Sequence, residues 1–170
     1  MCIRDRSCIA VLKSGPTEAL FKAIEKAVTD TVGVKLFTLL YVAPSRTRVK
    51  RLYTNMPKEY PVGGYKEIKS TPWHKRVVEE RRAWVGYNAM DIEWAYFDHE
   101  LIKSLGCEAA MNVPVVYGGR LLGTMNLLDK AGHYKESDVA LCEPYAALLI
   151  GPFLDAIAAD PDIEGRSRSA

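Results

Sequence analysis

Two apolar runs that flank a glycine pair constrain the fold of this chain most. Residues 108–117 and 120–129 are rich in Val, Leu and Met, and they meet at Gly118-Gly119. Apolar runs on either side of such a pair are typical of an antiparallel β-hairpin. The sequence therefore predicts two long paired strands late in the chain.

Helical and strand patterns alternate along the rest of the chain. Apolar residues recur at helical spacing over 16–32, which predicts a helix that ends before Gly33. The other expected elements are strands over 34–42, 48–54 and 83–86, helices over 73–81 and 99–105, and a last helix that Ser137 caps and that Pro144 and Pro152 kink. This order indicates an α+β fold in which terminal helices cover an antiparallel sheet.

Composition places the chain among ordinary globular proteins. Its 170 residues suit one domain, and 48% of them are apolar and 26% charged. A net charge of +2 is too close to zero to favour nucleic acid or an anionic membrane as a partner. No apolar run reaches the roughly 18 residues that a membrane span needs. With no signal peptide either, we expect a cytoplasmic protein with no membrane or nucleic-acid partner.

Cysteine and histidine spacing gives no sign of a metal site. Cys2, Cys8, Cys107 and Cys142 form no C-x-x-C pair, and the three histidines stand singly. We therefore expect no metal and no cofactor. Cys142 is interpreted as a small residue in a helix core and Cys107 as a loop thiol.

Both ends are expected to lie outside the domain, which would then span residues 16–159. Residues 1–15 begin with MCIRDRS, which resembles translated sequencing adapter, so we interpret them as an artefactual or disordered N-terminus. Residues 160–170 are polar without an apolar period and are expected to form a disordered tail. Within the tail, residues 163–166 resemble a protease-tag site.

The stretch 101–149 resembles the C-terminal half of GAF domains. The matching strings are LIKSLGCEAAMNVPVVYGGRLLGTMNLL and HYKESDVALCEPYAALL. They contain the pairs Leu105-Gly106, Val113-Pro114, Gly118-Gly119 and Leu122-Gly123, and Tyr134 with Asp138 four residues on. Residues 16–100 agree in element order only. The resemblance implies a five- or six-stranded antiparallel sheet with terminal helices packed on one face and a ligand pocket on the other.

Two amides interrupt the apolar strands of the hairpin. Asn112 and Asn126 are flanked by apolar residues, and a buried amide without a partner costs about 1–3 kcal/mol. Each must therefore bond to backbone, water or ligand. By resemblance, the pocket-facing positions are Ala110 and Asn112 on the first strand and Thr124, Asn126 and Leu128 on the second.

The segment 87–99 is aromatic and acidic without a clear period. We interpret it as a lid over the pocket, because Trp and Tyr supply apolar walls with one polar group each. The alternative is that its rings complete the core from outside. Its expected ligand-binding residues are Trp94, Tyr96, Asp98 and His99, which join Ala110, Asn112, Thr124 and Asn126 of the hairpin.

Hairpin register decides whether the two amides share a face. A regular two-residue turn at Gly118-Gly119 would pair Asn112 with Met125. A three-residue loop would pair Tyr117 with Leu121 and Asn112 with Asn126, and a one-residue slip inverts every side chain. We therefore predict a three-residue or bulged hairpin. Both amides then lie on the pocket floor under the lid, while Met111, Met125 and Leu127 face the terminal helices.

Three kinds of GAF domain can be compared with this chain residue by residue. By resemblance, methionine sulfoxide reductases of this fold need a cysteine before the Val-Pro strand and three carboxylates. Here Cys107 is offset, and Ala110, Asn126 and Leu128 stand at the carboxylate positions. Bilin-binding GAF domains place a Cys-His pair or a histidine where this chain has Leu127-Leu128.

Cyclic-nucleotide-binding GAF domains provide the third comparison, through an N-K…F-x-x-x-D-E pattern. Asp129-Lys130…Tyr134…Asp138-Val139 matches it in part. We expect Lys130 and Asp138 to form an ion pair that ties the hairpin to the last helix, and cyclic nucleotide stays open as a ligand.

Two classes of function stay open. The first is a stand-alone sensory or regulatory module that binds a small molecule and acts as a homodimer or through a signalling partner protein. The alternative is an enzyme on a GAF scaffold, for example one like the free methionine-R-sulfoxide reductases, using Cys107, His74, His99 or Asp98. No set of catalytic residues is recognised, and we expect Cys107 to be dispensable. A histidine within hydrogen-bond reach of Cys107 would favour the enzyme.

Overall fold

A six-stranded antiparallel sheet lies at the centre of the molecule, with strand order β3-β2-β1-β6-β5-β4. The computed structural model describes residues 3–161 and the side chains of residues 6–161. The strands are β1 (Leu36–Val42), β2 (Arg48–Thr54), β3 (Tyr65–Glu67), β4 (Trp84–Gly86), β5 (Ala109–Tyr117) and β6 (Arg120–Asp129). The predicted hairpin, β5–β6, and its neighbour β1 form the middle of this sheet.

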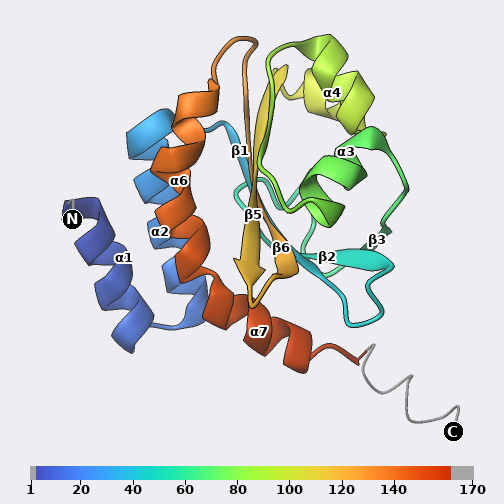
Figure 1. The fold of residues 1–170 in the computed structure, drawn as a ribbon. Coiled ribbons are helices and arrows are strands. Elements are labelled where there is room, and N and C mark those ends of the chain that lie inside the picture. The colour runs from blue at the N-terminus through green and yellow to red at the C-terminus, as the bar shows by residue number, and fades with distance from the viewer. Residues whose placement is uncertain (1–2, 162–170) are drawn as a thin grey trace, which may run out of the picture.

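Helices cover both faces of the sheet (Figure 1). One face carries α1 (Ile3–Ser14), α2 (Thr17–Val32), α6 (Glu136–Leu148) and α7 (Ile150–Ala158). The other carries α3 (Pro72–His74), the π-helical turn η1 (Lys75–Glu79), α4 (Ala89–Ala95) and α5 (His99–Ser104). The α+β prediction, with terminal helices on one face, is confirmed.

Alternating side chains on β5 and β6 separate two apolar cores. Met111, Met125 and Leu127 are fully buried against the terminal helices, as predicted. Ala110 and Leu128 point the opposite way and pack with Leu36 under α4 and α5. This second face holds the smaller core, and it is the face that leaves room for a cavity.

The last helix differs from the prediction at its start. It begins at Glu136 rather than after a Ser137 cap, and the Lys135 N–H donates to Asp138 Oδ2 at 3.0 Å. The expected kink is present as a 49° bend between α6 and α7. Pro152 explains its position, because proline has no N–H for the Leu148 carbonyl and its ring clashes with that carbonyl in a continuous helix.

The first residues differ in part from the prediction: residues 3–14 form α1 rather than a disordered segment, and the artefactual origin stays a prediction. Cys8 is fully buried in the core beside α2 and α6, and Val11 packs against that core. Cys8 and Val11 are three residues apart, a helical spacing that the adapter-like string at residues 1–7 does not exclude. Residues 162–170 of the expected tail lie outside the described residues.

The β5–β6 hairpin combines a two-residue turn with a bulge. Gly118 and Gly119 have φ of 56° and 72°, and Tyr117 pairs with Arg120. The pairing then shifts: Val116 faces Leu121, but Val115 faces Gly123, so Leu122 is an extra residue. The three-residue loop and the Tyr117–Leu121 pair were therefore wrong. The predicted bulge and the Asn112–Asn126 pair are confirmed.

Gly123, which follows the extra residue, is tightly enclosed between β1 and α7. A Cβ atom at this position would overlap the Leu40 carbonyl oxygen of β1 and lie 2.5 Å from Phe153 Cε2 of α7. Neither neighbour is free to move, because one is sheet backbone and the other is a fully buried ring. The position therefore requires glycine for space.

We expect Gly123→Ala to destabilise the protein by about 3 kcal/mol, because the added methyl group forces β1, β6 and α7 apart. Urea unfolding followed by circular dichroism measures this change. Gly64→Ala is the matched control, since a Cβ there meets nothing within 4 Å. It should alter the free energy of unfolding by less than about 0.5 kcal/mol. Equal effects of the two variants would contradict the packing argument.

Candidate functional site

A cavity of about 320 Å³ lies between the sheet and the layer formed by α3, α4 and α5. Its floor consists of side chains from β1 and β6, and its roof is aromatic. The floor includes Leu36, Thr38, Leu40, Thr124, Asn126 and Leu128, and the roof includes Trp73, Trp94, Tyr96 and Phe97. Ligand sites in proteins range from roughly 300 to 1,000 Å³, so this cavity suits a small organic molecule.

The two asparagines form the centre of a hydrogen-bond chain beneath the cavity. Asn112 Nδ2 donates to Asn126 Oδ1 at 2.7 Å, and Asn126 Nδ2 donates to Thr38 Oγ1 at 3.2 Å. Asn112 Oδ1 accepts from Trp73 Nε1 and from the Tyr96 hydroxyl, both at 2.9 Å. These bonds run from β1 through β6 and β5 to the roof. They fix Trp73 and Tyr96 above the sheet.

Other expected site residues lie at different depths. Thr124, Asn126, Trp94, Tyr96 and Asp98 all line the cavity. Asn112, fully buried, reaches the lining only through its hydrogen bonds, and Ala110 lies in the apolar core below. His99 lies outside the lining, with its Nδ1 3.5 Å from Glu100 Oε1. The role of all eight expected residues in ligand binding stays a prediction.

The predicted lid is a short helix held against β4. Asn88 begins α4 by accepting hydrogen bonds from the N–H groups of Met90 and Asp91, at 2.9 and 3.2 Å. Trp94 stacks on Trp84 with ring centroids 5.8 Å apart, and its own side chain is 47% exposed. Trp94 therefore contacts the core, the cavity and solvent together.

One wall of the cavity carries the predicted site residue Asp98 together with Arg51 and Lys66, which were not predicted as site residues. Lys66 Nζ lies 3.5 Å from Asp98 Oδ1, and Asp98 Oδ2 accepts a hydrogen bond from the Tyr60 hydroxyl at 3.1 Å. Arg51 lies over the Tyr60 ring, with Cζ 4.7 Å from its centroid. Burial lowers the pKa of Lys66, and the Asp98 carboxylate opposes this effect.

Cys107 does not have the surroundings of a nucleophile. It is fully buried among apolar side chains, and burial raises the pKa of its thiol to about 11. A thiol with this pKa stays protonated at neutral pH, and the thiolate is the reactive form. Over residues 3–161, no hydrogen bond joins Cys107 to a histidine, and no three His, Cys, Asp or Glu side chains are grouped to hold a metal ion.

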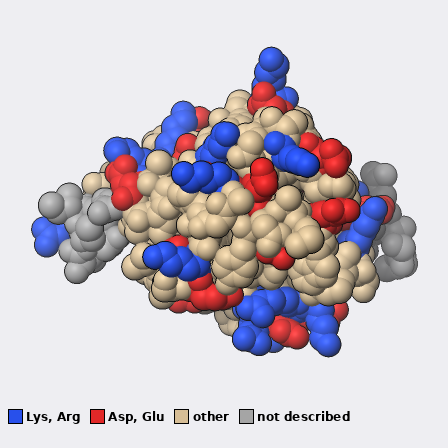
Figure 2. Space-filling view, turned by 90° about the horizontal axis from the view of Figure 1, so that it is seen from above, with Lys and Arg blue, Asp and Glu red and all other residues tan. Residues whose placement is uncertain are grey.

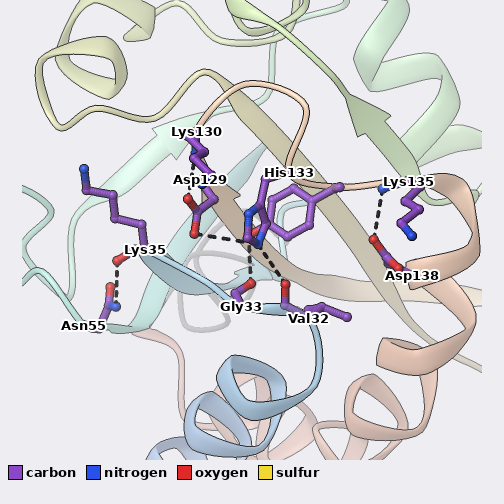
Figure 3. A network of polar contacts seen from close by, with 10 residues as sticks. Val32, Gly33, Lys35, Asn55, Asp129, Lys130, His133, Lys135 and Asp138 are labelled. Carbon is purple, nitrogen blue, oxygen red and sulfur yellow. Dashed lines mark hydrogen bonds and ion pairs between the residues drawn. The ribbon is translucent and has the colours of Figure 1, made fainter.

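A second polar network ties the loop after β6 to the end of α2 (Figure 3). His133 Nε2 lies 2.8 Å from the Val32 carbonyl oxygen, and the Tyr134 hydroxyl donates to the Gly33 carbonyl at 3.2 Å. The expected Lys130–Asp138 ion pair is wrong, because Asp138 bonds to the Lys135 N–H instead. His133 and Tyr134 hold the hairpin to the helical layer in its place.

Charged side chains of both signs are mixed on the face shown in Figure 2, with apolar and neutral surface between them. In the described part of the chain, no single helix is long and apolar enough to cross a bilayer. Only α6 and α7 taken together meet that composition, across their 49° bend.

Comparison with known proteins identifies the fold. No family model and no curated protein matches the chain. Among solved structures, the GAF domain of an Acinetobacter phosphoenolpyruvate-protein phosphotransferase shares 14% identity with a TM-score of 0.71, over 92% of this chain and 94% of its own. The corresponding domain from Coxiella burnetii shares 16% identity with a TM-score of 0.72, over 91% and 93%.

A third similar structure is the chromophore-binding domain of an R. palustris bacteriophytochrome. It shares 13% identity with a TM-score of 0.62, over 90% of this chain and 62% of its own. The chain therefore has the fold of GAF domains, as the resemblance of residues 101–149 implied.

We expect the Asn112–Asn126 bond to show as energetic coupling. Asn112→Ala and Asn126→Ala should each be destabilising, since each leaves buried donors or acceptors without partners. The double variant should be less destabilised than the sum of the two by about 1 kcal/mol or more. Urea unfolding of the four proteins measures the coupling. Tyr53→Phe paired with Asn112→Ala is the control cycle, because the Tyr53 hydroxyl donates to Glu25 of α2 on the other face of the sheet, and that cycle should be additive.

Proposed function

We propose that this protein is a sensory or regulatory module that binds a small molecule in the cavity between the sheet and α3–α5. The observation that carries the proposal is the preformed roof. Trp73 and Tyr96 are held above the floor by hydrogen bonds to a fully buried asparagine. A mostly apolar cavity with a few convergent polar groups is the usual form of a ligand site.

The proposed contacts are the expected residues that line the cavity. Thr124 and Asn126 offer polar groups from the floor, and Trp94, Tyr96 and Asp98 close the roof. Ala110, Asn112 and His99 lie behind the lining, so their proposed role is support. The bacteriophytochrome domain of similar fold binds a chromophore, which supports a small-molecule role without identifying the ligand here.

Burial and pKa argue against the enzyme alternative for Cys107. The same features leave no activated thiol at the cavity, because Cys107 belongs to the apolar core below it. We therefore favour binding over thiol chemistry at Cys107. We also propose that the module acts in the cytoplasm through a partner protein.

The cavity is tested by filling it. Thr124→Phe adds a ring to the floor, so it should abolish the retention of any co-purifying small molecule seen by native mass spectrometry of the wild-type protein. It should also abolish the thermal shifts that a metabolite library produces. Thr29→Phe is the matched control, because Thr29 is exposed on α2, in the helical layer on the other face of the sheet, and does not line the cavity. A Thr124→Phe protein that binds as the wild type does would overturn the proposed site.

We also propose that the protein is a homodimer through its helical face. The exposed large apolar side chains on that face include Leu12 of α1 and Leu141 of α6, which are 43% and 50% exposed. Exposed apolar side chains are stabilised when the same face of a second copy packs against them and removes them from water.

Sedimentation velocity should show a dimer at micromolar concentration. Leu141→Glu should shift the protein toward monomer, because it places a charge in the interface. Lys130→Glu, on the exposed loop after β6, changes charge elsewhere and should leave the dimer intact. A wild-type protein that sediments only as a monomer contradicts the proposal.

A further inference from the structure

Three charged side chains meet at one wall of the cavity. Arg51 of β2 pairs across the sheet with Leu40, a floor residue, and so lies on the cavity face. Lys66 of β3 pairs with Val49, which also lines the cavity. Asp98 comes from the roof, between α4 and α5. Two cations from the sheet therefore face one carboxylate from the lid segment.

Arg51 and Lys66 are incompletely partnered. Arg51 Nη1 donates to the Pro61 carbonyl at 3.1 Å, but its buried Nε has no acceptor among the described residues. Lys66 Nζ has Asp98 Oδ1 at 3.5 Å, a long contact, and lies 4.0 Å from the centroid of the Phe97 ring. Asp98 also accepts a hydrogen bond from Tyr60. The Asp98 carboxylate therefore contacts Lys66 and Tyr60, and no carboxylate among the described side chains forms an ion pair with Arg51.

Arg51 and Lys66 are partly buried, so a shortage of negative charge beside them is costly. Burial is the largest influence on Arg51 and Lys66, and it lowers the pKa of both groups, while Asp98 acts in the opposite direction. A charge removed from water is stabilised by an opposite charge nearby. The other charged residues of the lining are Lys69, Glu67 and Glu93, which are all exposed and therefore screened by solvent. The inner cluster is thus one negative charge short.

Away from the charged wall, the cavity is mostly apolar and partly aromatic. The floor offers aliphatic side chains of β1 and β6, and the indole of Trp73 and the ring of Tyr96 stand over it, with centroids 6.3 Å apart. Such surfaces favour a ring system over a flexible polar molecule. Thr124 and Asn126 supply the few polar groups of the floor.

We propose that the ligand is an apolar, planar carboxylate, with its carboxylate between Arg51 and Lys66 and its ring between the floor and Trp73. The proposal rests on the cavity being the binding site. A single negative charge completes the cluster, whereas a doubly charged phosphate monoester would reverse its imbalance. Arginine suits this role because its planar guanidinium binds carboxylates in a fixed geometry.

Three matched probes test the charge of the ligand. Indole-3-acetate, indole-3-acetamide and tryptamine share one ring system and differ in charge, and isothermal titration calorimetry measures their affinities for the full chain. Indole-3-acetate should bind at least about tenfold more tightly than the amide, and tryptamine should bind most weakly. Equal affinities, tighter binding of either other probe, or no binding of indole-3-acetate would overturn the proposal.

Variants of the cluster test its geometry. Arg51→Gln and Lys66→Gln should each weaken indole-3-acetate about tenfold and leave indole-3-acetamide unchanged. Asp98→Asn should strengthen indole-3-acetate, because it removes the competing carboxylate, and this gain cannot arise from poor folding. Lys50→Gln is the matched control. The substitution removes one positive charge from β2, the strand of Arg51. Lys50 pairs with Tyr41, however, and lies on the opposite face, over the Tyr65 ring.

Co-purification experiments separate the proposed carboxylate ligand from the proposed binding site. A neutral or cationic molecule that co-purifies with the wild-type protein and is lost in Thr124→Phe would overturn the carboxylate and leave the binding site intact. If no ligand or probe binds differently to the wild-type protein and to Thr124→Phe, both the proposed carboxylate and the proposed binding site are overturned. A co-purifying apolar carboxylate that is lost in Arg51→Gln supports both.

Discussion

The hydrogen bond between Asn112 and Asn126 is the interaction on which the site depends. It joins two central strands at positions fully or almost fully buried, where an unpaired amide would be costly. The bond forms only in one hairpin register, and in that register all of Thr124, Asn126 and Leu128 face the cavity. One polar pair therefore selects which side of the hairpin is floor and which is helix-facing core.

The same pair also positions the roof. Asn112 accepts hydrogen bonds from Trp73, which follows the Thr71 cap of α3, and from Tyr96, which ends α4. Two segments far apart in sequence are thus attached to one amide oxygen. Backbone pairing of the strands positions the floor residues, and side-chain hydrogen bonds to Asn112 position the roof residues. The shape of the cavity therefore depends on the register of the sheet.

The resemblance to GAF domains implied which face each strand of the hairpin presents, and local patterns in the sequence were sufficient to predict the hairpin and the long helix α2. They were sufficient because side-chain alternation and glycine turns act over short distances. Helix α4 was missed, although Asn88 followed by Asp91 is a start signal of the kind used elsewhere in the chain. The aromatic residues of that segment do not follow a clear helical period.

Arg51 and Lys66 could not be assigned from the sequence. Strand β3 is three residues long and pairs with β2 across a loop, so nothing local indicates that Lys66 faces Val49. Likewise, Arg51 follows Lys50 in a basic run that suits a solvated strand equally well. A one-residue irregularity between Leu39 and Leu40 sets which of these two cations enters the cavity. Long-range pairing, rather than residue type, separates them.

The extra residue in β6 has a consequence for how this hairpin tolerates changes in length. Leu122 packs in the helix-facing core and lies between the regular pairs Val116–Leu121 and Val115–Gly123. Loss of Leu122 would join those pairs into an uninterrupted ladder and keep the asparagines opposite each other. Loss of one residue between Val113 and Val115 would instead shift one asparagine past the other. Related hairpins can therefore differ by one residue near the tip and still share the same floor.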